Sequence, residues 1–128
     1  MIRKIIVVCL VVLLSACAKE ALVFNLENEP VITGSGDTPT IDQVRSAVRR
    51  AVVKKTWRIR ELSPNSFEAS YSKGKKIARV TIDFTTKEYN IRYKSSELLL
   101  YNGSTIHGRY NAWVRGLRKY INVNLALL

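Results

Sequence analysis

Four short segments between residues 56 and 93 alternate apolar and polar side chains. Such alternation is typical of a β-strand that is buried on one face and solvated on the other. The connections between the segments are short and rich in Ser, Pro, Gly and Lys, which favours tight turns. The pattern predicts a four-stranded antiparallel meander, made from the runs "TWRIREL" (56–62), "FEASY" (67–71), "ARVTIDF" (78–84) and "YNIRY" (89–93).

Two amphipathic helices flank the predicted sheet. The sequence "TIDQ" is a capping box with Thr40 as N-cap and Gln43 at the third helical position, and apolar residues then recur every three or four positions up to Val52. A second helix is expected from about Thr105 to Ile121, and the apolar tail after it either packs on the domain or extends the helix. A sheet with one apolar face buries that face against a single layer, which the two helices can supply. We therefore expect an α+β two-layer sandwich of the order α-β-β-β-β-α.

The N-terminal seventeen residues have the features of a targeting segment. Two basic residues precede an unbroken apolar run over residues 5–14, and Ser15 and Ala16 follow it. Ten such residues rise about 15 Å as a helix, half of the roughly 30 Å of a bilayer core, so a secretory signal fits better than a transmembrane helix. The two cysteines of the chain, Cys9 and Cys17, both lie in this part.

The sequence Leu14-Ser15-Ala16-Cys17 matches the lipobox of bacterial lipoprotein precursors at all four positions, and the chain resembles that family here. The resemblance implies that Cys17 receives a diacylglycerol group, that the signal of residues 1–16 is removed, and that the new amino group can be acylated. In that family a residue other than Asp after the cysteine, here Ala18, implies passage to the outer membrane, lipid-anchored on the periplasmic side. An ordinary secretory signal that is cut near a cysteine is the alternative.

The part of the chain after the anchor is expected to divide in two. Residues 17–39 would carry the lipidated cysteine and a tether broken by proline and glycine, with a reach of roughly 25 Å, and residues 40–128 would form a basic α+β domain. The apolar segment "ALVFNL" (21–26) is expected to add a short strand to the domain edge, or else to serve as a docking segment. The three leucines of residues 98–100 do not alternate with polar residues, so we expect both sides of this segment to be buried.

Lysine and arginine number 21 against 10 aspartates and glutamates, a formal charge of +11 that points to an acidic partner. Anionic lipid, lipopolysaccharide, acidic peptidoglycan groups or an acidic envelope protein would suit such a surface. The alternative is a solvated charged face with no ligand. The candidate residues lie on the polar side of the strands, on the "KGKK" hairpin and on the first helix: Arg58, Arg60, Arg79, Arg92, Lys73, Lys75, Lys76, and with them Arg45 and Arg49.

Few residues could perform catalysis or bind a metal. The one histidine, His107, follows Ser104 closely, but no third group is placed to orient it, and a helix-capping role is the alternative. With one histidine and no cysteine after Cys17, we expect no metal or other cofactor. Strand acids such as Glu68 and Asp83 are expected in salt bridges with Arg58 or Arg92.

The aromatic residues of the strands argue against a nucleic-acid partner. Modules that stack bases carry aromatic side chains on an exposed sheet face. Here the aromatic residues alternate in phase with the aliphatic ones, so we expect them in the core: Trp57, Phe67, Tyr71, Phe84, Tyr89 and Tyr93.

These observations predict an envelope lipoprotein that is a non-catalytic structural or adaptor module facing the periplasm. A binder of anionic envelope lipid or polymer is the alternative, and an enzyme that uses His107 with Ser104 is the least supported class. The globular part resembles small uncharacterised lipoproteins of Gram-negative bacteria, chiefly over "NGSTIHGRYNAWV" (102–114), and this resemblance implies no activity.

Overall fold

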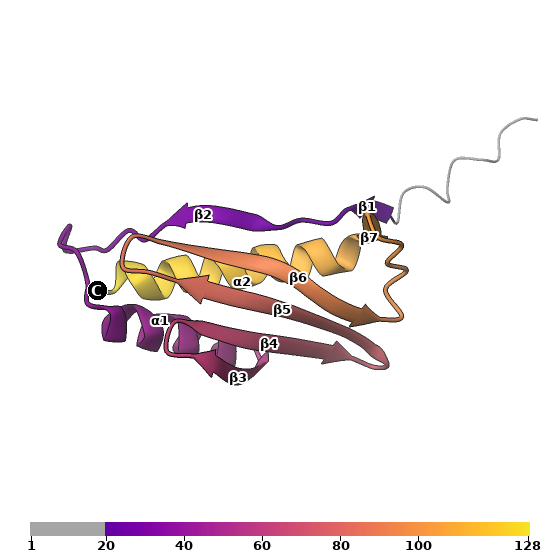
Figure 1. Ribbon diagram of the computed structural model, residues 1–128, viewed down its shortest axis with the longest axis horizontal. Coiled ribbons are helices and arrows are strands. Elements are labelled where there is room, and N and C mark those ends of the chain that lie inside the picture. Colours follow the sequence, from indigo (N-terminus) through magenta and orange to yellow (C-terminus); the bar gives the residue numbers. More distant parts are fainter. Residues whose placement is uncertain (1–19) are drawn as a thin grey trace, which may run out of the picture.

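The structure, a computed structural model, describes residues 20–128. The predicted signal and Cys17 lie outside the described residues. The described chain folds as α+β, with a sheet layer and a helix layer behind it (Figure 1). The elements are β1 (Glu20–Leu22), β2 (Leu26–Pro30), α1 (Ile41–Lys54), β3 (Arg58–Ser63), β4 (Ser66–Lys73), β5 (Lys76–Phe84), β6 (Glu88–Glu97), β7 (Thr105–His107) and α2 (Gly108–Ala126).

The main sheet has five antiparallel strands in the order β2-β6-β5-β4-β3. The four strands expected from the alternating pattern are β3 to β6, and they form a meander as predicted. The prediction of a four-stranded sheet is wrong in its strand count, because β2 adds a fifth strand beside β6. A second, two-stranded sheet of β1 and β7 lies at one end of the molecule (Figure 1).

The N-terminal segment that was expected to be a tether is part of the fold from β1 onward. Its backbone is held by asparagine side chains from distant parts of the chain. Asn111 accepts a hydrogen bond from Phe24 N at 3.0 Å and donates one to Leu22 O at 2.8 Å, and Asn90 accepts one from Asn28 N at 2.7 Å. The expected edge strand exists, but it spans Leu26–Pro30 rather than residues 21–26.

The two helices differ from the prediction mainly at the start of α2. The capping box of α1 is confirmed: Thr40 Oγ1 accepts from Gln43 N at 3.1 Å, and Gln43 Oε1 accepts from Thr40 N at 2.9 Å. Helix α2 begins at Gly108 instead of Thr105, because residues 105–107 pair with β1. The apolar tail extends this helix to Ala126.

The core lies between the helix layer and one face of the main sheet. Phe67, Phe84 and Tyr89 are buried there as expected, while Tyr71 and Tyr93 are half-buried against the same cluster. The run of residues 98–100 differs from expectation: its middle leucine is buried, but the leucines on either side are 65% and 60% exposed. Among residues 20–128, no helix is long and apolar enough to span a bilayer.

Candidate binding surfaces

Three of the four arginines predicted to bind an anionic ligand from the strands are already paired with carboxylates. Arg60 lies 2.9 Å from Glu68, and Arg79 lies 2.7 Å from Glu97. Arg92 connects three strands, because its guanidinium is 2.7 Å from Asp83 of β5 and 3.1 Å from Glu27 of β2. The expected pairing of Arg92 with a strand acid is therefore confirmed for Asp83.

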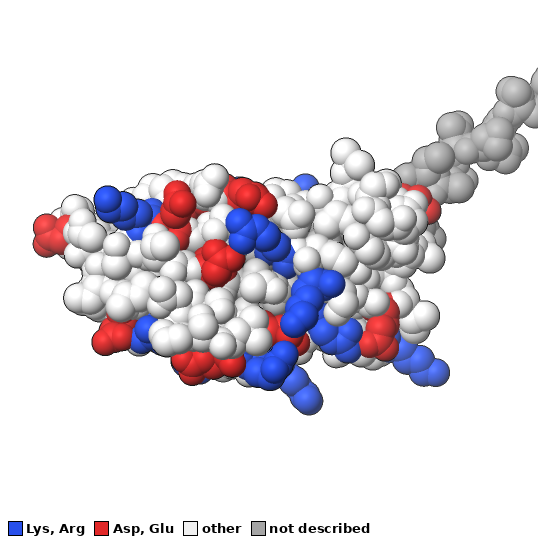
Figure 2. All heavy atoms as spheres, viewed as in Figure 1, with Lys and Arg blue, Asp and Glu red and all other residues white. Residues whose placement is uncertain are grey.

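The open face of the sheet therefore carries mixed charge rather than a single positive patch. Glu68 also accepts a hydrogen bond from Lys94, and the hydrogen bonds from Lys94 and Arg60 hold the pKa of Glu68 below its usual value. Lysine, arginine and acidic side chains are interspersed over this face (Figure 2). An external anion would have to compete with these internal carboxylates, which weakens the face as an anion site.

Among the described residues, Arg58 and the lysines of the "KGKK" hairpin make no ion pair with an acid. Arg58 is exposed at the start of β3, on the outer strand of the sheet. In the "KGKK" hairpin, Lys73 ends β4, Lys76 begins β5 and Lys75 lies in the turn, where Gly74 adopts a φ of +63° that the tight turn requires. The register places Arg58 opposite Ser70, three residues before Lys73, while Arg60, Arg79 and Arg92 between and beside them are paired with acids, so the predicted residues do not form one continuous positive site.

The helix layer carries the larger excess of positive charge. Helices α1 and α2 together contain eight lysines and arginines and one acid, Asp42. Arg45 forms an ion pair with Asp42 and donates a hydrogen bond to Pro64 O. Arg49 lies 3.7 Å from Glu61, and its guanidinium lies over the ring of Phe67. These two predicted cations therefore support the fold. Within the described chain, Arg50, Lys54, Arg109 and Lys119 make no ion pair with an acid.

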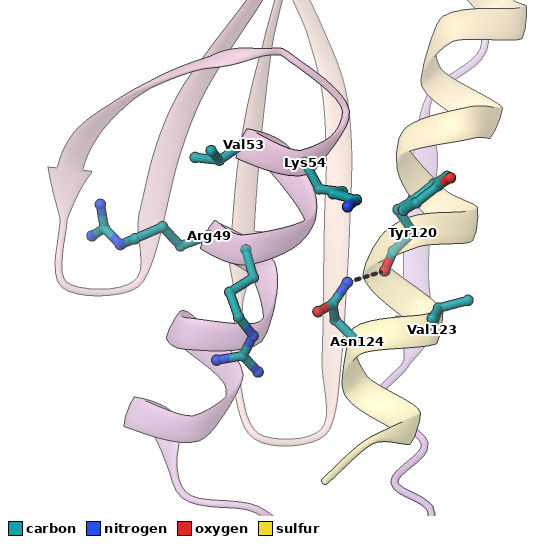
Figure 3. Close-up of a pocket in the computed structure, with 7 residues that line it drawn as sticks. Arg49, Val53, Lys54, Tyr120, Val123 and Asn124 are labelled. Carbon is teal, nitrogen blue, oxygen red and sulfur yellow. Dashed lines mark hydrogen bonds between the residues drawn. The ribbon is translucent and has the colours of Figure 1, made fainter.

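A shallow groove of about 630 Å³ lies between α1 and α2 on this layer. We call it the helix-layer groove. Exposed valines from both helices form its apolar surface: Val53 is 57% and Val123 51% exposed. Figure 3 shows Arg49, Val53 and Lys54 projecting from α1, and Tyr120, Val123 and Asn124 from α2. The complete lining is Arg49, Arg50, Val53, Lys54, Tyr120, Val123 and Asn124.

Two of the groove residues on α2, Tyr120 and Asn124, make further contacts. Asn124 Nδ2 donates to Tyr120 O at 2.9 Å, and Lys55 Nζ lies 4.8 Å from the centre of the Tyr120 ring. A smaller cavity of about 300 Å³ adjoins the groove and shares Lys54 and Tyr120 with it. The half-buried Trp113 lines this cavity and packs edge-on against Tyr71 at 4.9 Å.

The residues considered for catalysis have structural hydrogen bonds. His107 Nδ1 accepts from Arg109 N at 3.1 Å, which makes His107 the N-cap of α2. Ser104 Oγ donates to Asn102 Oδ1 at 3.4 Å, and over residues 20–128 no hydrogen bond joins Ser104 to His107. In the same range, no group of three or more His, Cys, Asp or Glu side chains could hold a metal ion.

The helix-layer groove was missed in the sequence because its signal is spread over two distant elements. Val53 and Val123 fall just outside the apolar stripes of their helices, and each alone is an ordinary exposed valine. They become a surface only because α1 and α2 pack side by side. Comparison of the chain with protein families, curated proteins and solved structures finds no match.

Proposed function

We propose that this protein is a lipid-anchored envelope lipoprotein, held at the periplasmic side of the outer membrane, that acts as a non-catalytic adaptor. Its anchor is Cys17, supported by the lipobox, and its binding surface is the helix-layer groove. The observation that carries the adaptor role is the combination of exposed valines on both helices with Arg50 and Lys54, which make no ion pair with an acid among the described residues. Such a surface suits a macromolecular ligand better than a reaction.

The partner is an acidic, amphipathic helix of another envelope protein. Two adjacent helices form a groove that receives a third helix, whose apolar face covers Val53 and Val123. Acidic residues on the flanks of that helix then meet Arg50 and Lys54. Complementary charge of this kind raises the association rate and fixes orientation more than it raises affinity. Binding is therefore sensitive to salt.

Binding of anionic lipid or polymer on the open sheet face is a weaker candidate. Three of its four arginines are paired with Glu68, Glu97 and Asp83, and the cost of breaking those pairs offsets the free energy that binding an external anion would contribute. The proposed adaptor does not depend on that face.

The anchor is tested by expressing the full chain and comparing it with Cys17→Ser. We expect the unaltered protein to incorporate labelled palmitate, to float with membranes and to show an acylated N-terminal peptide by mass spectrometry. The Cys17→Ser chain should carry no palmitate label and no acylated peptide, and should associate with membranes only weakly. A bare Cys17 thiol in protein that nevertheless floats would overturn the lipid anchor.

The groove is tested with a synthetic amphipathic peptide that carries Leu on one face and Glu on the other. We expect it to shift NMR signals of α1 and α2 around Val53 and Val123, and to bind about tenfold more weakly after Arg50→Glu with Lys54→Glu. The matched control, Arg58→Glu with Lys87→Glu, changes the net charge equally at exposed positions that do not line the groove and should bind as the parent does. Equal losses in both variants would mean non-specific charge attraction. Shifts confined to the sheet face would place the binding surface elsewhere.

A further inference from the structure

One end of the molecule exposes several large apolar side chains together. The loop between β6 and β7 and the strand pair β1/β7 lie at this end (Figure 1). We call it the β1/β7 end. Leu22 is 73% exposed, Leu98 65%, Leu100 60% and Tyr101 43%. The surface there is largely uncharged (Figure 2). Exposed apolar groups gathered in this way mark an interaction surface.

The backbone holds two of these leucines outward in a strained conformation. Leu98 has a φ of +58° and Leu100 a φ of +60°, in the left-handed region that disfavours residues other than glycine and asparagine. Leu99 between them is buried, and its carbonyl accepts from His107 N at 2.8 Å. The loop is therefore pinned by its middle residue while both neighbours project into solvent. Strain of this kind is typical of functional segments.

Lysines flank the apolar group at the same end. The hairpin Lys73–Lys76 continues directly beyond the paired residues Ile77 and Glu97, and Leu98 follows Glu97 in the chain. Arg109 is exposed at the start of α2 beside β7. The acids at this end are Glu20 and Glu97, and Glu97 is paired with Arg79. The balance is positive, which suits anionic headgroups.

The N-terminal chain enters the fold at this end as well. Cys17 precedes Glu20 by three residues, so its α-carbon can be at most about 11 Å from that of Glu20. A lipid on Cys17 would keep the β1/β7 end against the bilayer surface. The reach of roughly 25 Å expected for a twenty-residue tether does not apply, because residues 20–39 belong to the fold.

We infer that the β1/β7 end is a membrane-docking surface. Leu22, Leu98 and Leu100 enter the headgroup region of the bilayer, Tyr101 lies at the interface, and the lysines of the hairpin contact anionic lipid. Tyr101 suits that position because its ring, stacked on Tyr93 at 4.2 Å, is apolar while its hydroxyl is polar. This inference rests on the proposed lipid anchor for its orientation, and adds a second contact that fixes how the domain faces the membrane.

The first test places one fluorescent label on the lipidated protein. After processing, Cys9 has left with the signal and the Cys17 sulfur is alkylated, so a cysteine introduced by Leu100→Cys is the single reactive thiol. In vesicles of phosphatidylethanolamine and phosphatidylglycerol, we expect a polarity-sensitive dye there to shift to the blue and to be shielded from iodide. The same dye on Val123→Cys should remain accessible. Equal quenching at both positions in protein that floats would overturn docking and leave the anchor standing.

The second test does not need the anchor. A Cys17→Ser chain should still sediment weakly with the same vesicles, and Leu98→Asn with Leu100→Asn should weaken this at least about tenfold. Asparagine tolerates the left-handed region, so this variant should keep or raise its melting temperature, which separates lost docking from lost folding. Lys73→Gln with Lys75→Gln should weaken binding to the anionic vesicles and leave binding to phosphatidylcholine unchanged. Unchanged sedimentation of the asparagine variant would overturn the inference.

Discussion

Tyr89 and Tyr110 are both fully buried, but only one of their hydroxyls has a partner. Tyr89 OH donates to Asn122 Oδ1 at 2.7 Å, whereas Tyr110 OH has no hydrogen-bond partner among the described residues. Burial raises the pKa of both hydroxyls above its ordinary value, so both stay neutral. An unpaired buried hydroxyl lowers stability, while a paired one adds to it.

We therefore expect opposite results from the same substitution at these two positions. Tyr89→Phe should lower the free energy of unfolding by about 1–2 kcal/mol, because Asn122 loses its donor. Tyr110→Phe should leave it unchanged or raise it by about 1 kcal/mol. Urea unfolding of the Cys17→Ser chain measures both. A loss of more than 1 kcal/mol at Tyr110→Phe would show that its hydroxyl is hydrogen-bonded in solution.

Thr56 ends α1 in a conformation that normally requires glycine. Its φ is +66°, and the hydrogen bonds from Thr56 N to Val53 O and from Trp57 N to Val52 O form a Schellman motif. A β-branched residue is strained there, so Thr56→Gly should raise the free energy of unfolding by about 0.5–1 kcal/mol. Thr81→Gly, in the middle of β5, is the control and should lower it. A destabilised Thr56→Gly chain would contradict the strain argument.

At the scale of elements, β2 shows what joins the N-terminal segment to the domain. Glu29 Oε2 accepts from Arg118 Nε and Asn122 Nδ2, each at 2.9 Å, so β2 is tied to α2 as well as to β6. Burial alone would raise the pKa of Glu29, but the hydrogen bonds from Asn122 and Arg118 outweigh it and leave the pKa lowered.

This lowered pKa predicts a pH dependence of stability. A carboxyl group whose pKa is lower in the folded than in the unfolded chain contributes stability above its unfolded value, and loses it as pH falls through the folded value. The parent chain should therefore lose stability more steeply below about pH 4.5 than Glu29→Gln does. Glu88→Gln, on an exposed side chain, should follow the parent. Parallel curves for parent and Glu29→Gln, measured by urea unfolding against pH, would contradict the role of this network.

The elements that were predicted correctly have local signals, and those that were missed do not. The capping box at Thr40 and the alternation through β3 to β6 lie within a few residues, so periodicity alone reveals them. The attachment of β1 and β2 depends on Asn90, Asn111 and Asn122, which lie 62 to 93 residues from their partners in the chain. Proline and glycine in that segment favoured a tether, and only the apolar run of residues 21–26 indicated that part of it belongs to the fold.

At the scale of the whole molecule, the two proposed surfaces lie on different parts of the fold. Helix α2 starts beside β7 at the docking end, and Tyr120 lies twelve residues along it. At 1.5 Å per residue the helix-layer groove is about 18 Å from that end. If the β1/β7 end rests on the bilayer, the groove faces the periplasm at that height. Membrane contact and partner binding therefore do not compete for one surface.

If Cys17 carries the proposed lipid, the short chain between it and Glu20 would make weak docking effective. A linker of three residues would then keep the leucines of the β1/β7 end at a high local concentration near the lipid, and this concentration falls roughly as the −3/2 power of linker length. Inserting twelve Gly/Ser residues between Lys19 and Glu20 should therefore lower the ratio of docked to undocked protein about tenfold. This ratio is best measured in a Leu98→Asn background, in which we expect docking to be partial. Iodide quenching of the dye on Leu100→Cys then reports the docked fraction.

The control for that experiment is the same insertion after Gly36. Gly36 lies in an exposed loop between β2 and α1, and an added side chain there would meet no atom within 4 Å. The longer loop leaves the linker to Cys17 unchanged, so docking should be unchanged, while partner binding at the helix-layer groove should survive both insertions. Equal docking in the two insertion variants would contradict this argument. It would mean that the length of the linker to Cys17 does not affect docking, so that the leucines and lysines bind the membrane independently of the anchor.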